Sequence, residues 1–262
     1  MNLSSLLIDI SQKIGEKLKS TDQTLHGALN NNWIVKDEEE KKYVLRIQKE
    51  SPLQIPLIRA EYEGIGYVKN GKEYRFRSIE EQASFTRRCI HNNIPTPKIR
   101  YFDNNVMLRD FVEGIPLVEF LHQKDSSAMI KNHLSNIIHA HKKGIILGDR
   151  WGPNEIVTLQ NTLTYIDFDI ELTARDAKEF EISQILYHCI LPSGNRKAAL
   201  HCVEELIASE EFVPYEKNVV AGFLRGHLGY FAKRKVYCGA DPQSIESEIN
   251  DIISAILAFR RR

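Results

Sequence analysis

The chain has 262 residues, zero formal net charge and 27% charged residues, so it lacks the basic excess of a protein that binds nucleic acid or an anionic membrane. Its hydrophobic content of 42% is typical of a globular protein, and its length suits one large domain or two lobes sharing a cleft. The four cysteines lack paired spacing, which is typical of free thiols in a reducing compartment. No apolar run reaches the roughly 20 residues that span a bilayer, and no basic start precedes the first apolar segment. We therefore expect a cytoplasmic protein without a transmembrane segment.

The first part of the chain predicts a helix followed by short strands. Residues 3–18 carry leucine and isoleucine at helical spacing, which predicts an amphipathic helix. Residues 33–35 and 43–47 are rich in β-branched and aromatic residues, and so are 98–102 and 106–112. These runs predict a small antiparallel sheet.

A hairpin and a second helix are predicted between these strands. Asn70-Gly71 separates two apolar-rich runs within residues 65–76, which is the strongest short hairpin signal. Ser78 is a good N-cap, and Glu81 lies at the capping-box position three residues later, which predicts a helix over residues 78–92.

The rest of the chain is predominantly helical. Apolar periodicity predicts helices at residues 126–143, 177–190, 197–209, 213–233 and 242–260. The pattern breaks at residues 113–116. We therefore expect an α+β fold of two lobes, with a small antiparallel N-lobe over residues 1–113 and a mainly helical C-lobe over 114–262.

The most informative segment is the predicted catalytic hairpin, residues 147–169. It contains Gly148-Asp149, then Asn154, then Ile166-Asp167-Phe168-Asp169. Phosphoryl transfer needs one carboxylate that orients the attacking hydroxyl, and an Asn and a second carboxylate that hold Mg²⁺ against the nucleotide phosphates. Residues 155–166 read as two short strands, which would bring these groups together.

Several segments, in the same order, resemble the aminoglycoside-phosphotransferase and choline-kinase superfamily. The resemblance rests on residues 29–35, 42–47, 93–97, 107–114, 148–154, 166–169 and 177–182. Small atypical Ser/Thr kinases of the tRNA-modification (KEOPS) type look similar over the same stretch. The resemblance implies a protein-kinase-like fold that uses ATP and Mg²⁺, with the nucleotide between the lobes.

The resemblance also implies roles for individual residues. Asp149 would be the catalytic carboxylate, and Asn154 and Asp167 would be Mg²⁺ ligands. The hinge that meets adenine would consist of Phe111, Val112 and Glu113. Asp169 is left open between a second-metal ligand and a turn residue.

The cation that grips the phosphates has two candidates. Arg46 lies at the strand position that the Tyr-Val-Leu-Arg pattern marks, and it is favoured over Lys69, which is closer to the second helix. Glu81, or its neighbour Glu80, would pair with this cation. An unusually long insertion, residues 50–77, separates Arg46 from that helix.

Some features depart from the family or allow a structural interpretation. Leu147 stands where the family usually has His, and Gly27 stands without a glycine-rich loop. Arg150 could offset charge near the phosphates or be solvated, and solvation is favoured, whereas Trp151 could face the substrate or cover the seam between the lobes. Aromatic residues of the last third are expected in the core rather than in an acceptor pocket, namely Tyr215, Phe223, Tyr230 and Phe231. Adjacent His-Cys pairs at 188–189 and 201–202 face different directions on a helix, which argues against zinc.

These observations favour an ATP- and Mg²⁺-dependent phosphotransferase that moves the γ-phosphoryl group to a hydroxyl of a small molecule. Few residues separate Asp169 from the helix predicted near 177, which leaves little platform for a peptide. An atypical protein Ser/Thr kinase is one alternative. A pseudokinase that acts as a scaffold is the other, although a scaffold has no physical need for Asp149, Asn154 and Asp167 together.

Overall fold

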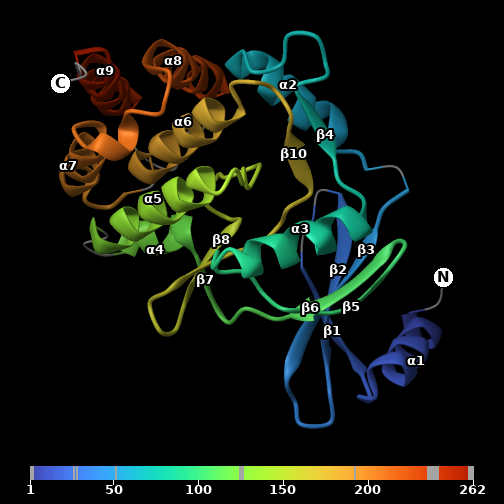
Figure 1. Ribbon diagram of the computed structural model, residues 1–262. Helices are drawn as coiled ribbons and strands as arrows, with labels where there is room; N and C mark the ends of the chain where they lie inside the picture. The colour runs from blue at the N-terminus through green and yellow to red at the C-terminus, as the bar shows by residue number, and fades with distance from the viewer. Residues whose placement is uncertain are drawn as a thin grey trace.

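The computed structural model describes residues 3–25, 27, 29–50, 52–123, 127–191, 193–234 and 242–258. An antiparallel sheet with two flanking helices forms one end, and helices form the other (Figure 1). This is the α+β, two-lobed, protein-kinase-like architecture that the sequence predicts.

The N-terminal sheet has the strand order β1-β2-β3-β6-β5, and all its neighbours are antiparallel. Its strands are β1 Lys19–Leu25, β2 Asn30–Lys36, β3 Lys42–Gln48, β5 Ile99–Asp103 and β6 Val106–Asp110. Helix α1, Leu3–Ile14, covers one face through Leu7 and Ile10, which pack on Leu45 and Leu108. The apolar face that the sequence shows on this helix is therefore used within its own lobe.

Helix α3, Ile79–His91, covers the other face of the sheet. The predicted capping box is present, since Ser78 Oγ accepts from the Glu81 N–H and the Glu81 carboxylate accepts from the Ser78 N–H. Ile79 and Ala83 pack on Met107 of β6. The cap thereby fixes which face of α3 meets the sheet, and this face carries Gln82.

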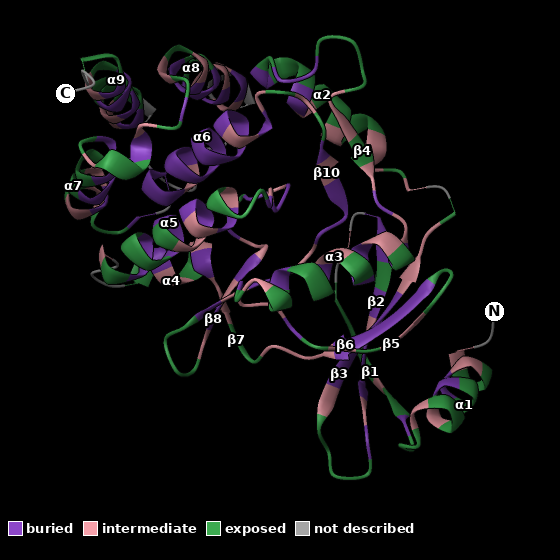
Figure 2. Ribbon diagram, viewed as in Figure 1, coloured by how far each residue is buried: buried purple, intermediate pink, exposed green. Residues whose placement is uncertain are grey.

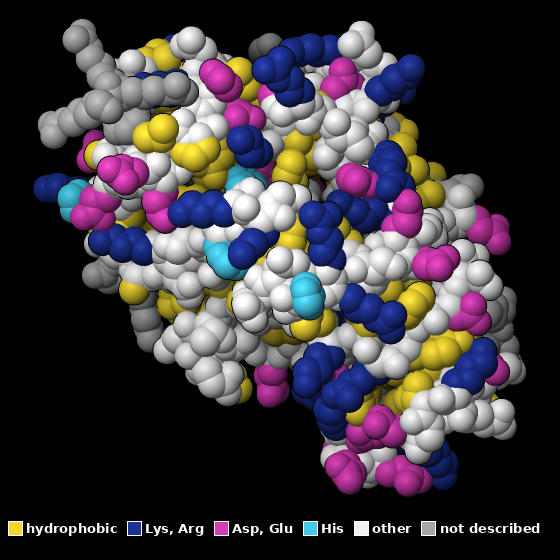
Figure 3. Space-filling model, viewed as in Figure 1, with side chains coloured by type: hydrophobic (Ala, Val, Ile, Leu, Met, Phe, Trp, Pro, Cys, Tyr) yellow, Lys and Arg dark blue, Asp and Glu magenta, His cyan; other side chains and the backbone are white. Residues whose placement is uncertain are grey.

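The turn between β2 and β3 carries exposed acidic side chains at the lower end of the view in Figure 3. Asp37 organises the turn, because its Oδ1 accepts from the N–H groups of Glu39 and Lys41. Lys19 and Lys36 both pair with Glu40. The acidic cluster is thus locally neutralised.

The insertion leaves the sheet and packs on the helical half. Helix α2, Ile55–Ile65, lies against α8, Lys217–Arg234 (Figure 1). Strand β4, Tyr74–Phe76, pairs with β10, Ile170–Leu172. Tyr62 and Tyr67 from the insertion pack on Phe180 of the helical half, with ring centroids 5.2 and 4.1 Å away.

The hairpin predicted over residues 65–76 is wrong. Residues up to Ile65 are helical, and the helix ends at Gly66, whose φ of 88° suits glycine. The Glu73 carboxylate accepts from the N–H groups of Lys69, Asn70 and Lys72. These amides are satisfied by one side chain rather than by a partner strand, so Asn70-Gly71 forms a turn without a hairpin.

The helical half contains the largest buried core, which Figure 2 shows in α5 and α6 in particular. Its elements are β7 Gly114–Pro116, α4 Leu117–Gln123, α5 Ser127–Lys142, β8 Glu155–Thr158, β9 Leu163–Tyr165, α6 Ala177–Ile190, α7 Arg196–Ile207, η1 Glu210–Phe212 and α9 Pro242–Ala258. Tyr215, Phe223 and Tyr230 are buried, and Phe231 packs against the same core, as expected.

Two further expectations concern membranes and cysteines. Within the described ranges, no helix is both long enough and apolar enough to cross a membrane. Cys89, Cys189 and Cys202 are free buried thiols, while Cys238 lies outside the described residues.

The crossing of α2 over α8 depends on a glycine. A Cβ on Gly226 would stand 2.0 Å from the Ile65 carbonyl oxygen, whereas Gly222 and Gly229 of the same helix have open space. We expect Gly226→Ala to lower the free energy of unfolding by about 1 to 3 kcal/mol, because α2 must move off α8. Gly222→Ala is the matched control and should leave stability unchanged or raise it by up to about 1 kcal/mol. Urea denaturation of both variants measures this, and equal stabilities would contradict the close packing.

Candidate active site

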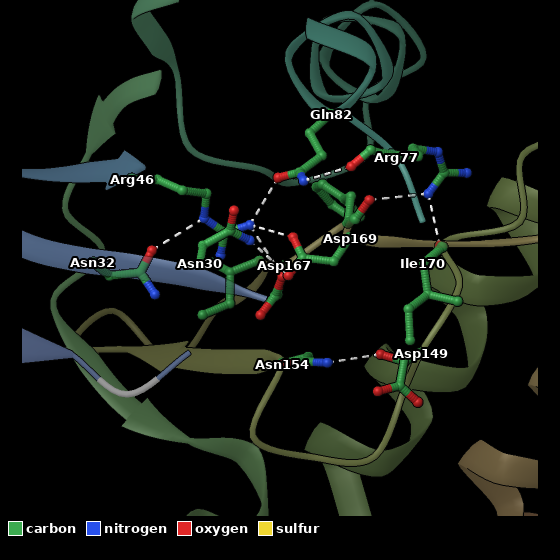
Figure 4. A network of polar contacts seen from close by, with 12 residues as sticks. Asn30, Asn32, Arg46, Arg77, Gln82, Asp149, Asn154, Asp167, Asp169 and Ile170 are labelled. Carbon is green, nitrogen blue, oxygen red and sulfur yellow. Dashed lines mark hydrogen bonds and ion pairs between the residues drawn. The ribbon is translucent and has the colours of Figure 1, made fainter. Parts of the chain in front are cut away.

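A cleft of about 1000 Å³ lies between the sheet and the helical half. The sheet contributes Val44 and Arg46, the hairpin contributes Asn154 and Asp167, and Asp149 lies on the same wall. The insertion also reaches the cleft, through Gln54, Ile58 and Glu61. Figure 4 shows the polar side chains that converge there.

The loop that carries Asp149 is held by a glycine with a left-handed backbone. Gly148 has a φ of 104°, and a Cβ there would stand 2.3 Å from the Ile170 carbonyl oxygen. Its N–H donates to Glu181 Oε1 at 2.6 Å. Glycine is therefore required before the carboxylate by both conformation and space.

Asp149 is positioned by two side chains from distant elements. Its Oδ1 accepts from the Tyr62 hydroxyl at 3.1 Å and from Gln184 Nε2 at 2.9 Å. Burial raises the pKa of Asp149, while the hydrogen bond from Gln184, the charge of Arg150 and the hydrogen bond from Tyr62 oppose the rise. The carboxylate is thus a stronger base than an exposed Asp, and one oxygen is not used by these donors.

The predicted hairpin is present and brings Asn154 beside Asp167. The Ile166 N–H donates to the Asn154 carbonyl at 2.9 Å, which ties the two ends of the β8–β9 hairpin together. Asn154 Nδ2 donates to the Asp149 backbone carbonyl at 2.8 Å (Figure 4). Asp167 has a φ of 62°, a left-handed conformation that is uncommon outside glycine and is found most often for Asn and Asp.

Arg150 is buried inside this hairpin, so the expectation that it is solvated is wrong. It is 1% exposed and pairs with Glu155 at 3.3 Å. Its guanidinium also donates to the carbonyls of Ile166 and Asp167 at 3.1 and 2.5 Å. Arg150 therefore holds the backbone that carries Asp167 rather than facing solvent.

Arg46 is the cation of the cleft that pairs with its carboxylates. Its Nη1 lies 3.1 Å from Asp167 Oδ1 and 2.5 Å from Asp169 Oδ1. It also donates from Nε to Asn32 Oδ1 at 3.1 Å and from Nη1 to Gln82 Oε1 at 2.9 Å (Figure 4). Lys69, the rival candidate, lies in an exposed bend and does not line the cleft.

The pKa values of the two carboxylates beside Arg46 shift in opposite directions. Burial acts to raise the pKa of Asp167, but the charge of Arg46 and the hydrogen bonds with Asp169 and Arg46 together outweigh it and lower this pKa to about 2. Burial raises the pKa of Asp169 well above its ordinary value, and the neighbouring Asp167 adds to this. Asp169 also accepts from Asn30 Nδ2 at 2.8 Å, so it is part of the polar network rather than a simple turn residue.

The predicted acidic partner on α3 is wrong by one residue. Glu81 is occupied by the capping box and by Arg75 at 2.7 Å, and Glu80 is exposed. Gln82 contacts Arg46 instead. A neutral amide in this place means that Asp167 and Asp169 alone balance the charge of Arg46.

Two of the three predicted hinge residues line the cleft, and the third does not. Phe111 and Val112 line the cleft, and the Phe111 N–H donates to the Lys42 carbonyl at 3.2 Å. Glu113 does not line the cleft and lies 3.8 Å from Lys42 Nζ. Trp151 lines the cleft with 47% of its surface exposed.

Three side chains of the site that the sequence did not predict lie on the helices α2, α3 and α6. Tyr62 and Gln184 contact Asp149 from segments without a recognisable motif. Gln82 is the residue after Glu81, which was the expected partner of Arg46. The run Asn30-Asn31-Asn32 was visible, and its two outer residues contact Asp169 and Arg46. These three consecutive asparagines at the start of a predicted strand were the sequence signal for this part of the polar network.

The donor set fits Mg²⁺ in the way the ion is bound beside phosphates. Mg²⁺ prefers oxygen ligands and usually takes one or two carboxylates together with phosphate oxygens and water. Asp167 and Asn154 offer such oxygens in the cleft. Within the described part of the chain no group of three or more His, Cys, Asp or Glu forms a complete metal cage, and neither His-Cys pair belongs to one.

No protein-family model matches the chain, and no curated protein sequence matches it. Among solved structures it is similar to a Rio2 kinase from Chaetomium thermophilum, with 14% identity over 97% of this chain and 76% of that one and a TM-score of 0.49. It is also similar to an ethanolamine kinase from Plasmodium vivax, with 13% identity over 98% and 87% and a TM-score of 0.45. A MAP kinase from Leishmania major matches with 12% identity over 98% and 84% and a TM-score of 0.42.

Removal of the cleft arginine should destabilise the protein mainly near neutral pH. Arg46→Met would leave two buried carboxylates without their cation, and we expect the free energy of unfolding at pH 7 to fall by about 3 to 5 kcal/mol. Arg46 lowers the pKa of Asp167, so this stabilisation is present above the ordinary pKa and is lost as pH falls toward 2. The difference between variant and wild type should therefore shrink in acid.

Urea denaturation at pH 7 and at about pH 2.5 measures this difference. Arg100→Met is the control, because Arg100 pairs with Asp110 in a partly exposed bridge, which should contribute about 1 kcal/mol or less. Equal losses for the two variants would show that Arg46 has no special electrostatic role.

Proposed function

We propose that this protein is a Mg²⁺-dependent phosphotransferase, which moves the γ-phosphoryl group of a nucleoside triphosphate to a hydroxyl acceptor. ATP is the nucleotide that the family resemblance implies. The single observation that carries the proposal is the convergence of Asp149, Asn154 and Asp167 in one cleft with Arg46. Kinase activity is the function that best explains why these four side chains line one cleft.

In this mechanism Asp149 orients the acceptor hydroxyl and accepts its proton. Its buried position makes it a better base, and Tyr62 and Gln184 fix the oxygen that does not face the hydroxyl. Arg46 attracts the phosphates, since a guanidinium offers several donors in a rigid fork. Mg²⁺, held by Asn154 and Asp167, would neutralise phosphate charge. The chain contributes mainly position and electrostatic stabilisation.

The insertion supports a small acceptor rather than a peptide. Tyr62 of α2 contacts the catalytic carboxylate, and Ile58 and Glu61 line the same end of the cleft. Strand β4 pairs with β10 directly after Asp169, so this segment is not an open platform. An atypical protein Ser/Thr kinase remains the second candidate, which the two-lobed fold equally suits, and autophosphorylation with labelled nucleotide distinguishes it.

Nucleotide binding and turnover test the proposal together. We expect a Mg²⁺-dependent rise in melting temperature with a non-hydrolysable nucleoside triphosphate, because a ligand of the native state stabilises it by mass action. Asp167→Ala should lose the Mg²⁺-dependent part. Asp149→Asn should retain the rise but lose roughly 10²- to 10⁴-fold in turnover with an accepted hydroxyl substrate.

The absence of any shift at millimolar nucleotide would favour a pseudokinase scaffold. Near-wild-type turnover in Asp149→Asn would contradict the role of Asp149 as the base, without contradicting nucleotide binding.

The hydroxyl of Tyr62 should tune the base. Tyr62→Phe removes a hydrogen bond that favours the ionised carboxylate, so the pKa of Asp149 should rise further and the acid limb of kcat/KM should move to higher pH. Tyr74→Phe is the control, because Tyr74 packs on Tyr62 at 5.1 Å and does not contact Asp149. A pH profile that is the same for Tyr62→Phe and wild type would show that the contact is structural only.

A further inference from the structure

Arg109 is a buried guanidinium that lines the cleft without a protein partner. It is 6% exposed. Within the described residues it makes no hydrogen bond and no ion pair, whereas the other buried arginines all do: Arg46 pairs with carboxylates, and Arg77 and Arg150 donate to backbone carbonyls. A buried cation is costly unless something neutralises it or accepts its hydrogen bonds, so this side chain requires an explanation.

Strand register places Arg109 on the cleft face, two positions along the strand from the level of Arg46. Arg109 is opposite Val44, and Arg46 is opposite Met107. Side chains two residues apart share a face, so Arg109 points to the cleft face of the sheet at about 7 Å along the strand from the level of Arg46. Phe111 and Val112 follow it and also line the cleft. The apolar side chains of Phe111 and Val112 suit a flat base, while Asp167 and Asp169, whose charges also act on Arg109, make their ion pairs with Arg46.

The chemistry of a guanidinium limits what it can recognise. Burial and the charge of Arg46 lower the pKa of Arg109 to about 10, so the side chain stays charged at neutral pH. It has five N–H donors and no acceptor. The matching partner must present acceptors side by side. Guanine does so with O6 and N7, to which arginine binds in a bidentate manner, whereas adenine presents an amino donor at the equivalent place beside N7.

We propose that Arg109 reads the base of the bound nucleotide and that the cleft prefers a 6-oxopurine nucleoside triphosphate, such as GTP, to ATP. This inference rests on the proposed function, because it assumes that the cleft binds a nucleotide. It makes Arg109 a specificity-determining residue, separate from the groups that act on the phosphates.

Calorimetric titration of the full chain with Mg²⁺ and nucleotides tests the inference. The ligands are the β,γ-imido analogues of GTP, ATP and inosine triphosphate, together with 7-deaza-GTP. Wild type should bind the guanine and hypoxanthine nucleotides at least tenfold more tightly than the adenine nucleotide. 7-Deaza-GTP, which lacks the N7 acceptor, should bind several-fold more weakly than GTP.

Arg109→Met should lose roughly 10- to 100-fold in affinity for the guanine nucleotide, since a bidentate contact contributes about 1 to 3 kcal/mol of discrimination. Its affinity for the adenine nucleotide should be unchanged or higher. Arg109→Lys keeps the charge but lacks the fork, and it should show the same loss of preference. Arg100→Met, which changes a surface arginine of β5, should bind as wild type does.

Three outcomes would overturn the inference. Wild type could bind the adenine nucleotide as tightly as the guanine nucleotide, a result that needs no variant and so does not depend on how the substitutions fold. Arg109→Met could weaken both nucleotides equally, which would assign the side chain to a phosphate. Binding of no nucleotide at all would overturn the proposed function as well, whereas a preference for adenine would leave that function standing.

Discussion

The ion pairs between Arg46 and the two carboxylates of residues 167 and 169 are the interaction on which the cleft depends. They join a strand of the N-terminal sheet to a loop that follows more than a hundred residues later. One cation thus holds both sides of the cleft, with amides from Asn30, Asn32 and Gln82 completing the network. Because these groups are buried, the charges interact through a medium of lower polarity than water, and their geometry is correspondingly fixed.

The insertion, residues 50–77, forms part of the wall of the cleft. A segment that precedes α3 in the chain packs on the helical half, where Tyr67 stacks on Phe180, Tyr62 meets the same ring edge-on, and β4 pairs with β10. Asp149 therefore receives hydrogen bonds from a segment before it in the chain, through Tyr62, and from one after it, through Gln184. Helix α2 lines this end of the cleft, so the shape of the cleft depends on how α2 packs.

Much of the fold could be predicted from the sequence, because local signals agree with the tertiary structure. Ser78 and Glu81 define the start of α3, and Asp149, Asn154 and Asp167 lie on one predicted hairpin. The structure of the insertion could not be predicted, since Asn70-Gly71 is a good hairpin signal locally but the partner of β4 lies at residues 170–172.

The burial of Arg150 illustrates a second limit of prediction from the sequence. No local pattern distinguishes a solvated arginine from one that is 1% exposed and satisfied by backbone carbonyls. The contact between Arg46 and Gln82 was not predicted because Glu81 could either pair with the cation or cap the helix. In the structure Glu81 caps the helix.

The contacts that complete the cleft join residues that are far apart in the chain. Tyr62 and Asp149 are 87 positions apart, Arg46 and Asp167 are 121 apart, and Asn30 and Asp169 are 139 apart. Such contacts close large loops, so their entropic cost is met only when both halves have already folded. A fragment that ended before residue 167 would retain the whole N-terminal sheet and yet leave Arg46 without its anions. The geometry of the cleft thus depends on both halves of the chain, and it should be among the last features to form as the protein folds.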